Sequence, residues 1–416
     1  MRTRARGRAY RLYVLAGLTA VDTLNLADRT LVMLLLQPIK DDLHLNDTQL
    51  GLITGIAFGL FYATLGIPFG RWSDRGNRVT ITSLAIGLWG LTVMACVFVN
   101  NYTQLVMARM AAAVGESGCK PPTYSLIGDY FPAPVARIRA MTLYLSGGPI
   151  SALLGLVVGG WLNEHYGWRM TFFLMGIPGL MLAAVIKLTI AEPRDCEAPR
   201  AHERTLPSPG KVLVVLWQQR AFRHLTLALI ALYMMGTGMY PWYGAFLVRS
   251  HGMNTAELGL WLGLIFGLSG VVGVLTGGYV ASRWFADNER GQMRMTALAV
   301  ATLVPCSITF LTVREKQHAL LALVPMIAVI NVFQGPSFTL MQRLVPAEMR
   351  ATAMSVLLLL MNLVAFGVGP QLVGILSDTL MPVIGVESLR YAMLAMSLLS
   401  LWSSYHFWQV GRWISC

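Results

Sequence analysis

The sequence predicts an all-α integral membrane protein with twelve transmembrane helices in two pseudo-symmetric six-helix bundles. Three observations support this prediction: the composition, the spacing of the apolar segments and a weak internal repeat. Of the 416 residues, 55% are hydrophobic and only 12% are charged, and the mean hydropathy is +0.58. Because soluble domains carry about 25% charged residues, this composition excludes an ordinary soluble enzyme.

Twelve apolar segments follow one another along the chain. Each is long enough for a membrane crossing, which needs about 20 apolar residues. Gly, Pro or a charge interrupts several of them, as is typical of spans that line a cavity. A polar stretch rich in Pro, Arg and Glu is predicted to be a cytoplasmic linker (191–221) between an N-terminal bundle (1–190) and a C-terminal bundle (222–416). The segments lie at 12–37, 48–70, 79–99, 104–128, 139–162, 169–190, 222–248, 256–282, 293–313, 319–341, 351–376 and 390–411.

The 32 Lys and Arg residues set the predicted orientation. Cytoplasmic loops are enriched in basic residues, and most of these residues fall on one side if the N-terminus lies in the cytoplasm. We therefore expect both termini in the cytoplasm, and the short tails favour a bacterial inner membrane. The net charge of +12 does not indicate a nucleic-acid partner, because the charges punctuate apolar segments instead of clustering on one soluble face.

The two halves resemble each other weakly. The segment 70–78 follows the second span, and a similar Gly-rich segment with Arg283 closes the eighth. Pro132 and Arg139 precede the fifth span, as Pro346 and Arg350 precede the eleventh. A repeat of six-span units predicts a transporter that rocks two halves about a central site.

These motifs resemble those of a known family. Gly70, Asp74, Arg75 and Arg78 are similar to the signature of the major facilitator superfamily, as is the Gly-rich fifth span that begins at Gly147. Within the superfamily the chain resembles the spinster-like branch, and the matching segments are 28–29, 74–78, 114–118, 125–132 and Arg139. The resemblance implies a monomeric secondary transporter. Animal members of the branch export lysolipids and sphingoid phosphates, and proton coupling is proposed for it. Lys120 departs from the branch, which usually has a small or polar residue there.

Charged residues inside two spans mark the candidate site. Asp22, Asn25 and Arg29 share one face of the first span, and Asp28 lies about 100° around from Arg29. Arg109, Glu116 and Lys120 share one face of the fourth span. A charge in hydrocarbon costs about 2.5–3.5 kcal/mol or more, so these residues are expected to face a water-filled cavity.

We assign proton coupling to Glu116 and Asp28, and substrate binding to Arg29, Asn25, Arg109 and Lys120. The alternatives are structural: an Asp28–Arg29 pair that locks the first span to a neighbour, or a permanent pair of Glu116 with Lys120 or Arg109. The protonation of a buried carboxyl depends on burial and on nearby cations, and a substrate anion that occupies those cations would change it.

The C-terminal half carries no charge in mid-span. Tyr240, Asn331 and Gln334 are its candidate substrate-binding residues. Tyr240 could equally belong to an interfacial aromatic belt, and Asn331 and Gln334 could bond neighbouring helices.

The loop after the second span is predicted to be a conformational latch. Asp74 is expected to cap a helix of the other half, the eleventh span, where the helix dipole favours a carboxylate. Arg75 and Arg78 are expected to pair with Asp129. Plain positive-inside anchoring would explain the arginines but not Asp74.

Together these features predict a secondary active transporter that works by alternating access, is proton-coupled and moves an amphiphilic or organic anion similar to a lysolipid. A carrier of small carboxylates, sugar acids or drugs is the alternative, and a receptor or a lipid enzyme is less favoured. The sequence contains no HExxH or GxSxG motif. Its five cysteines have no metal-ligand spacing. We therefore expect no enzyme activity, metal or cofactor, and the partners to be the substrate, protons and the bilayer.

Overall fold

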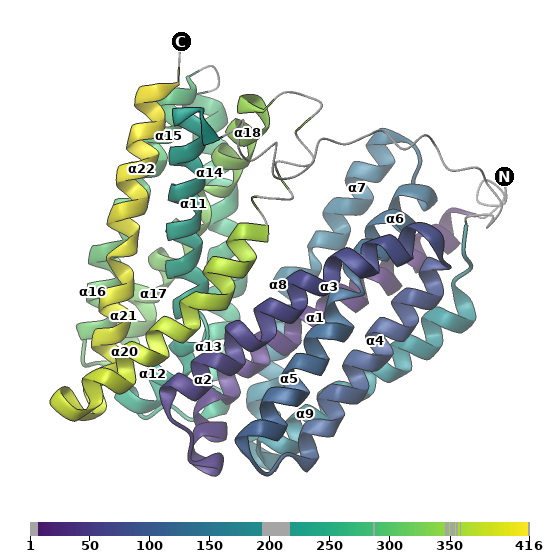
Figure 1. Ribbon diagram of the computed structural model, residues 1–416, viewed down its shortest axis with the longest axis horizontal. Coiled ribbons are helices and arrows are strands. Elements are labelled where there is room, and N and C mark those ends of the chain that lie inside the picture. The colour runs from purple at the N-terminus through teal and green to yellow at the C-terminus, as the bar shows by residue number, and fades with distance from the viewer. Residues whose placement is uncertain are drawn as a thin grey trace. The chain divides into compact units, whose positions relative to one another are not determined.

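The computed structural model describes residues 7–193, 217–285, 288–345, 349, 354, 357 and 359–414. All regular secondary structure among them is helical (Figure 1). By its contacts the chain forms two compact units. Unit 1 comprises Met1–Leu45, Ala57–Arg200 and Met253–Gly263; unit 2 comprises Asn46–Ile56, Ala201–Gly252 and Leu264–Cys416. The predicted domain ranges stay a prediction, and most of the predicted linker lies outside the described residues.

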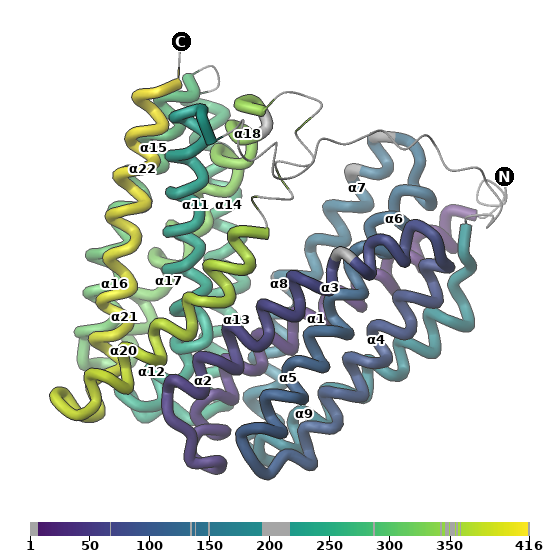
Figure 2. The backbone as a smooth tube through the Cα atoms, in the orientation of Figure 1, coloured from purple at the N-terminus to yellow at the C-terminus, as the bar shows by residue number. Residues whose placement is uncertain are grey.

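Unit 1 packs long helices around α1 and α4. In Figures 1 and 2, α4 lies beside α5 and α9. Helix α1 contacts α8, η2 and α9. The helices are α1 (Arg8–Leu43), α3 (Ile56–Arg75), α4 (Arg78–Ala95), η1 (Cys96–Phe98), α5 (Tyr102–Ser117), α6 (Lys120–Tyr130), α7 (Pro134–Leu145), α8 (Gly147–Leu153), the π-helical η2 (Leu154–Val158) and α9 (Gly159–Thr189), with most of α13 (Thr255–Leu264).

Glycines let these helices approach closely. A Cβ on Gly155 would lie 2.1 Å from Thr30 Oγ1 of α1, and a Cβ on Gly115 would lie 2.6 Å from the Trp89 backbone nitrogen of α4. Close contacts of this kind are typical of small residues at helix interfaces in membranes. Gly115 precedes Glu116, so its contact with α4 also fixes the helix that carries the candidate site.

Unit 2 is built around α11 and α22. Helix α22 contacts α11 and α15, and α20 contacts α2, a short helix from the N-terminal part of the chain. The helices are α2 (Asp47–Thr54), α11 (Arg220–Met239), α12 (Trp242–His251), η3 (Ile265–Ser269), α14 (Gly270–Trp284), α15 (Glu289–Ala301), α16 (Leu303–Thr312), α17 (Lys316–Val332), α18 (Gln334–Leu344), η4 (Met361–Val368), α20 (Gly369–Ile384), η5 (Gly385–Glu387), α21 (Ser388–Ser397) and α22, which spans Leu399–Trp413.

By length and composition alone, seven helices of the described chain could cross a membrane, or eight if a bent pair is one span. Two of them, Val135–Thr189 and Met361–Trp413, have 55 and 53 residues. At 1.5 Å per residue each is about 80 Å long, enough for two crossings. The first of these turns at Gly167, whose φ of 75° only glycine adopts readily. With α1 and the α5–α6 pair, whose embedded charges reduce their hydropathy, the described helices fit the predicted twelve-helix fold, which is confirmed.

Candidate functional site

Three ion pairs join α1 to the fourth crossing, α5 and α6. Arg29 Nη2 lies 2.6 Å from Glu116 Oε1. Arg109 Nη1 donates to both carboxylate oxygens of Asp28, at 3.0 and 2.9 Å. Lys120 Nζ lies 3.8 Å from Asp22 Oδ1. All six charges that the sequence places within these spans are therefore paired between helices.

The pairing differs from the structural alternatives considered for the sequence. An Asp28–Arg29 pair is wrong, because Asp28 bonds Arg109. A Glu116–Lys120 or Glu116–Arg109 pair is also wrong, because Glu116 pairs with Arg29 across to α1. The expected helix faces nevertheless come together, since Arg109, Glu116 and Lys120 all meet α1.

The cations of two pairs are more accessible than their acids. The Arg29 side chain is 18% exposed, whereas Glu116 is 0% exposed. The Lys120 side chain is 30% exposed, against 4% for Asp22. The Arg109–Asp28 pair is buried on both sides. Although the six charges sum to zero, the accessible charge of this site is positive.

Aromatic and polar side chains complete the surroundings. The Arg29 guanidinium lies over the rings of Tyr62 and Phe58, at 4.5 and 4.9 Å from their centroids. A ring face attracts a cation, so α3 holds Arg29 from a second side. The Tyr144 hydroxyl donates to Asp22 Oδ1 at 3.0 Å, and Asn25 is buried on α1 between Asp22 and Arg29.

In unit 2 the predicted substrate residues make local, uncharged contacts. The Gln334 amide donates to Asn331 Oδ1 at 2.9 Å, and the Asn331 amide donates to the Ile327 carbonyl at 2.8 Å. The Tyr240 ring packs edge-on against Phe266, with 5.0 Å between centroids. These contacts link neighbouring turns and helices of one unit.

Arg78 is the centre of a polar cluster at the start of α4. It is fully buried and lies 2.6 Å from Asp129 Oδ2, as the sequence led us to expect. It also bonds Glu192 and, at 2.7 Å, Ser125 Oγ. Glu192 was missed because it lies in the predicted linker. We call Arg78, Ser125, Asp129 and Glu192 the Arg78 cluster.

The other two residues of the predicted latch belong to α3. Asp74 and Arg75 are exposed at the end of α3. The start of the eleventh span, the expected partner of Asp74, lies largely outside the described residues.

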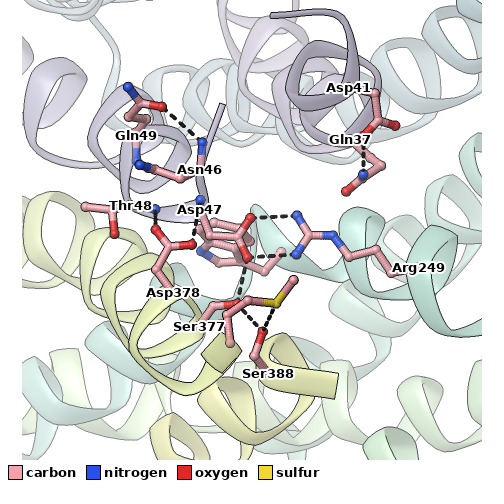
Figure 3. Close-up of polar contacts among 12 residues, drawn as sticks. Gln37, Asp41, Asn46, Asp47, Thr48, Gln49, Arg249, Ser377, Asp378 and Ser388 are labelled. Atoms are coloured by element: carbon pink, nitrogen blue, oxygen red, sulfur yellow. Dashed lines mark hydrogen bonds and ion pairs between the residues drawn. The ribbon is translucent and has the colours of Figure 1, made fainter. Parts of the chain in front are cut away.

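A second polar cluster, which we call the α2 anchor, was not predicted from the sequence. It consists of Asp47, Arg249, Ser377 and Asp378 (Figure 3). Arg249 donates two bonds of 2.7 Å to the two carboxylate oxygens of Asp47. Ser377 Oγ donates to Asp47 Oδ2 at 2.6 Å. Such a bidentate arginine–carboxylate pair is among the stronger hydrogen-bonded contacts in proteins.

Asp378 of α20 binds the N-terminus of α2. Its carboxylate accepts from the backbone N–H groups of Asp47 and Thr48, at 3.1 and 2.7 Å. These groups have no partner within their own helix, and the helix dipole favours a negative charge there. Glycine permits the contact, because a Cβ on Gly374 would lie 2.3 Å from the Asp47 carbonyl oxygen.

A polytopic helical fold with paired charges inside its spans defines a class of protein: an integral, multi-pass membrane transporter. The comparison with known families shows to which family of membrane transporters the chain belongs. The sequence model of the Major Facilitator Superfamily matches residues 19–370, so the chain belongs to this family.

Individual relatives agree with this assignment. The chain is 32% identical, over 91% of its length and 87% of the relative's, to an MFS-type efflux pump of Mycolicibacterium smegmatis. It is 25% identical to protein spinster homolog 1 of Xenopus tropicalis, over 90% of this chain and 75% of that one. A crystal structure of a bacterial homologue of the human lysosomal transporter Spinster, inward-facing and unoccupied, matches with a TM-score of 0.86 and 26% identity over 98% of both chains. The spinster-like resemblance is confirmed, and the relatives are transporters, not enzymes.

Proposed function

We propose that this transporter works by alternating access, couples transport to proton movement and carries an amphiphilic or organic anion. One observation carries the proposal. In the Arg29–Glu116 and Lys120–Asp22 pairs, the cation is more exposed than the acid. An incoming anion therefore meets Arg29 and Lys120 first.

The ion pairs supply a coupling route. A substrate anion that binds Arg29 competes with Glu116, whose Oε1 lies 2.6 Å from Arg29 Nη2, for the same guanidinium. Glu116, buried and with its cation engaged elsewhere, then takes up a proton because a lone carboxylate is unfavourable there. Asp28, held by Arg109, keeps the neighbouring charge balanced and is the second candidate for the proton.

The α2 anchor and the loop with Asp74 and Arg75 are proposed to stabilise opposite ends of the transport cycle. The α2 anchor holds α2 against α20, and α2 continues through Gly55 into α3 of unit 1. By the predicted orientation the anchor lies at the outer side, so its disruption would favour opening there. The loop with Asp74 and Arg75 is proposed to act at the inner side, next to the Arg78 cluster. Both termini are then cytoplasmic, and a bacterial inner membrane and a monomer remain our expectation.

The amphiphilic substrate is supported by the neighbouring aromatic residues and by the spinster-like relatives. Phe58 and Tyr62 flank Arg29, and unit 2 offers Tyr240 beside Phe266. Arg29 and Lys120 would hold the anionic head of the substrate. The similarity to an efflux pump makes export of a drug-like anion the second candidate.

The test uses purified protein in liposomes that contain a pH-sensitive dye. Lysolipids and organic anions are added in turn under an imposed proton gradient. We expect proton movement that depends on the added anion and is absent in Glu116→Gln. A substrate that is transported without proton movement would reject coupling, and preference for a cationic compound would reject the anion assignment. Glu315→Gln, at an exposed carboxyl of unit 2, is the matched control.

A further inference from the structure

A cavity of about 510 Å³ opens at one end of unit 2. Helix ends from four parts of the unit form it: the start of α11, the start of α15, the end of α18 and the end of α22. Its lining residues are Gln219, Arg220, Ala221, Glu289, Arg343, Leu344, Trp413 and Ile414. This volume lies in the range of ligand-binding pockets.

The charged lining residues are mostly cationic. Arg220 lies over the Trp413 ring, at 4.2 Å from its centroid. Arg343 bonds Glu289 at 2.5 Å, but its side chain is 58% exposed and has donors left for another partner. The lining therefore contains two arginines and one carboxylate.

A third arginine, Arg290, follows the lining residue Glu289 and bonds the lining residue Ile414. Arg290 reaches the Ile414 carbonyl through one long bond of 3.4 Å. Its Nε is buried and has no hydrogen-bond partner in the described part of the chain. Arg290 therefore adds a positive charge next to the lining of the cavity.

In unit 1, the side chains of the Arg78 cluster occupy the position that corresponds to this cavity. The Arg78 cluster gathers the start of α4, the end of α6 and Glu192, the third residue after the end of α9; these helices belong to the third, fourth and sixth crossings. The cavity gathers the corresponding ends of the ninth, tenth and twelfth crossings, together with the start of the seventh. In unit 1, two carboxylates contact one buried arginine. In unit 2, the one carboxylate pairs with Arg343, Arg220 also lines the cavity, and space remains. Both units therefore place charged side chains at equivalent helix ends. Carboxylates are in excess there in unit 1, and arginines are in excess in unit 2.

From this comparison we infer that the cavity is a binding site for a phosphate group, such as the headgroup of an anionic phospholipid. Arginine forks match phosphate oxygens. Basic pockets between membrane helices on the cytoplasmic side bind anionic headgroups, and Trp is typical of the membrane interface. Trp413 is 45% exposed, so its ring is available to a lipid beside the cavity. The inference does not depend on the transported substrate or on proton coupling.

The test is lipid retention by purified protein in native mass spectrometry. Detergent-solubilised protein is mixed with phosphatidylglycerol or with phosphatidylcholine of the same acyl chains. We expect retention of phosphatidylglycerol, reduced about tenfold in Arg220→Gln/Arg343→Gln. Glu289→Gln should change it in the opposite direction, because it removes the competing carboxylate. The double variant Arg139→Gln/Arg283→Gln, at exposed arginines outside the cavity, removes the same charge and should leave retention unchanged.

A separate arm identifies the source of the phosphate. Inorganic phosphate is added to lipid-stripped protein, and thermal stability is measured. Stabilisation that is lost in Arg220→Gln/Arg343→Gln would support a site for a free phosphate anion, whereas retention of phosphatidylglycerol alone would support a lipid site. Equal loss in the control double variant, or no dependence of lipid and phosphate binding on Arg220 and Arg343, would overturn the inference.

Discussion

The two units carry their polarity in different ways. In unit 1, six charged residues within the spans form three pairs between α1 and the fourth crossing. In unit 2, the candidate residues Tyr240, Asn331 and Gln334 are uncharged and make local contacts. Charges in pairs can exchange partners without leaving a lone charge in hydrocarbon. The comparison suggests that unit 1 performs the charge exchange and that unit 2 supplies shape and hydrogen bonds.

The strongest way to break this comparison is Glu116→Gln. Gln keeps the shape and still accepts from Arg29, but it cannot take up a proton. We expect anion-driven proton movement in liposomes to fall to the level of protein-free liposomes, while the protein folds. Circular dichroism and gel filtration check the fold. Unchanged proton movement would remove Glu116 from coupling and would make its pair with Arg29 a structural one.

The second test concerns the fully buried pair Asp28–Arg109. Removing one partner leaves the other charge alone in the protein interior, which costs about 3–5 kcal/mol of stability. We expect Arg109→Gln and Asp28→Asn each to lower the thermal unfolding temperature strongly.

A double-mutant cycle then measures the pairing itself. The variant Asp28→Asn/Arg109→Gln should recover part of the lost stability, because neither charge is left without a partner. Additive losses would show that the two side chains act separately. Proton coupling that survives in the stable double variant would remove Asp28 from the coupling route.

The sequence predicts the fold and the helix faces well, because both follow from local periodicity. Arg109, Glu116 and Lys120 recur at helical spacing, and all three point to α1 in the structure. Their partners could not be predicted in the same way. Whether Glu116 pairs with Arg29 of α1 or with Arg109 or Lys120 of its own crossing depends on how far α1 is shifted along α5, and no local pattern encodes that shift.

The α2 anchor also depends on contacts between distant parts of the chain, which local sequence patterns do not predict. Asn46 and Gln49 form a capping box, so the start of α2 could have been identified from the sequence. Asp47, however, looks like an ordinary acidic residue in a first helical turn. Asp378, which accepts from the backbone N–H of Asp47, lies 331 positions away in the sequence. Gly374 is needed only because the two helices touch there, and the sequence does not show that contact. Glu192 was missed for a related reason, because a charge just beyond a span resembles any loop charge.

The third test separates conformational from chemical roles. Asp47→Asn weakens the two bonds from Arg249, and we expect α2 to detach from α20 in a larger share of molecules. An effect of about 1–3 kcal/mol would change the ratio of conformations about 5- to 150-fold. Spin labels at the exposed positions Asp41 and Val383 report the distance distribution.

The control for this test is Asp42→Asn, which removes an accessible carboxylate that pairs with Arg169 at 2.7 Å in unit 1. Exposed pairs of this kind contribute about 0–1 kcal/mol. We expect its distance distribution to match that of the unchanged protein. An equal shift in both variants, or none in Asp47→Asn, would contradict a gating role for the α2 anchor.

Substitutions of the uncharged candidate residues in unit 2 are expected to have the smallest effects on transport. They test whether unit 2 takes part in the charge exchange proposed for unit 1. Gln334→Ala removes one neutral hydrogen bond of 2.9 Å to Asn331, and such a bond contributes about 1 kcal/mol. We expect the KM for transport to rise by less than about tenfold, with the number of protons moved per substrate unchanged. Tyr240→Phe, which keeps the ring against Phe266, should change the KM still less if the ring itself is the contact. A loss of coupling in either variant would show that unit 2 takes part in charge exchange although it has no charge in mid-span, and the division of roles between the units would have to be given up.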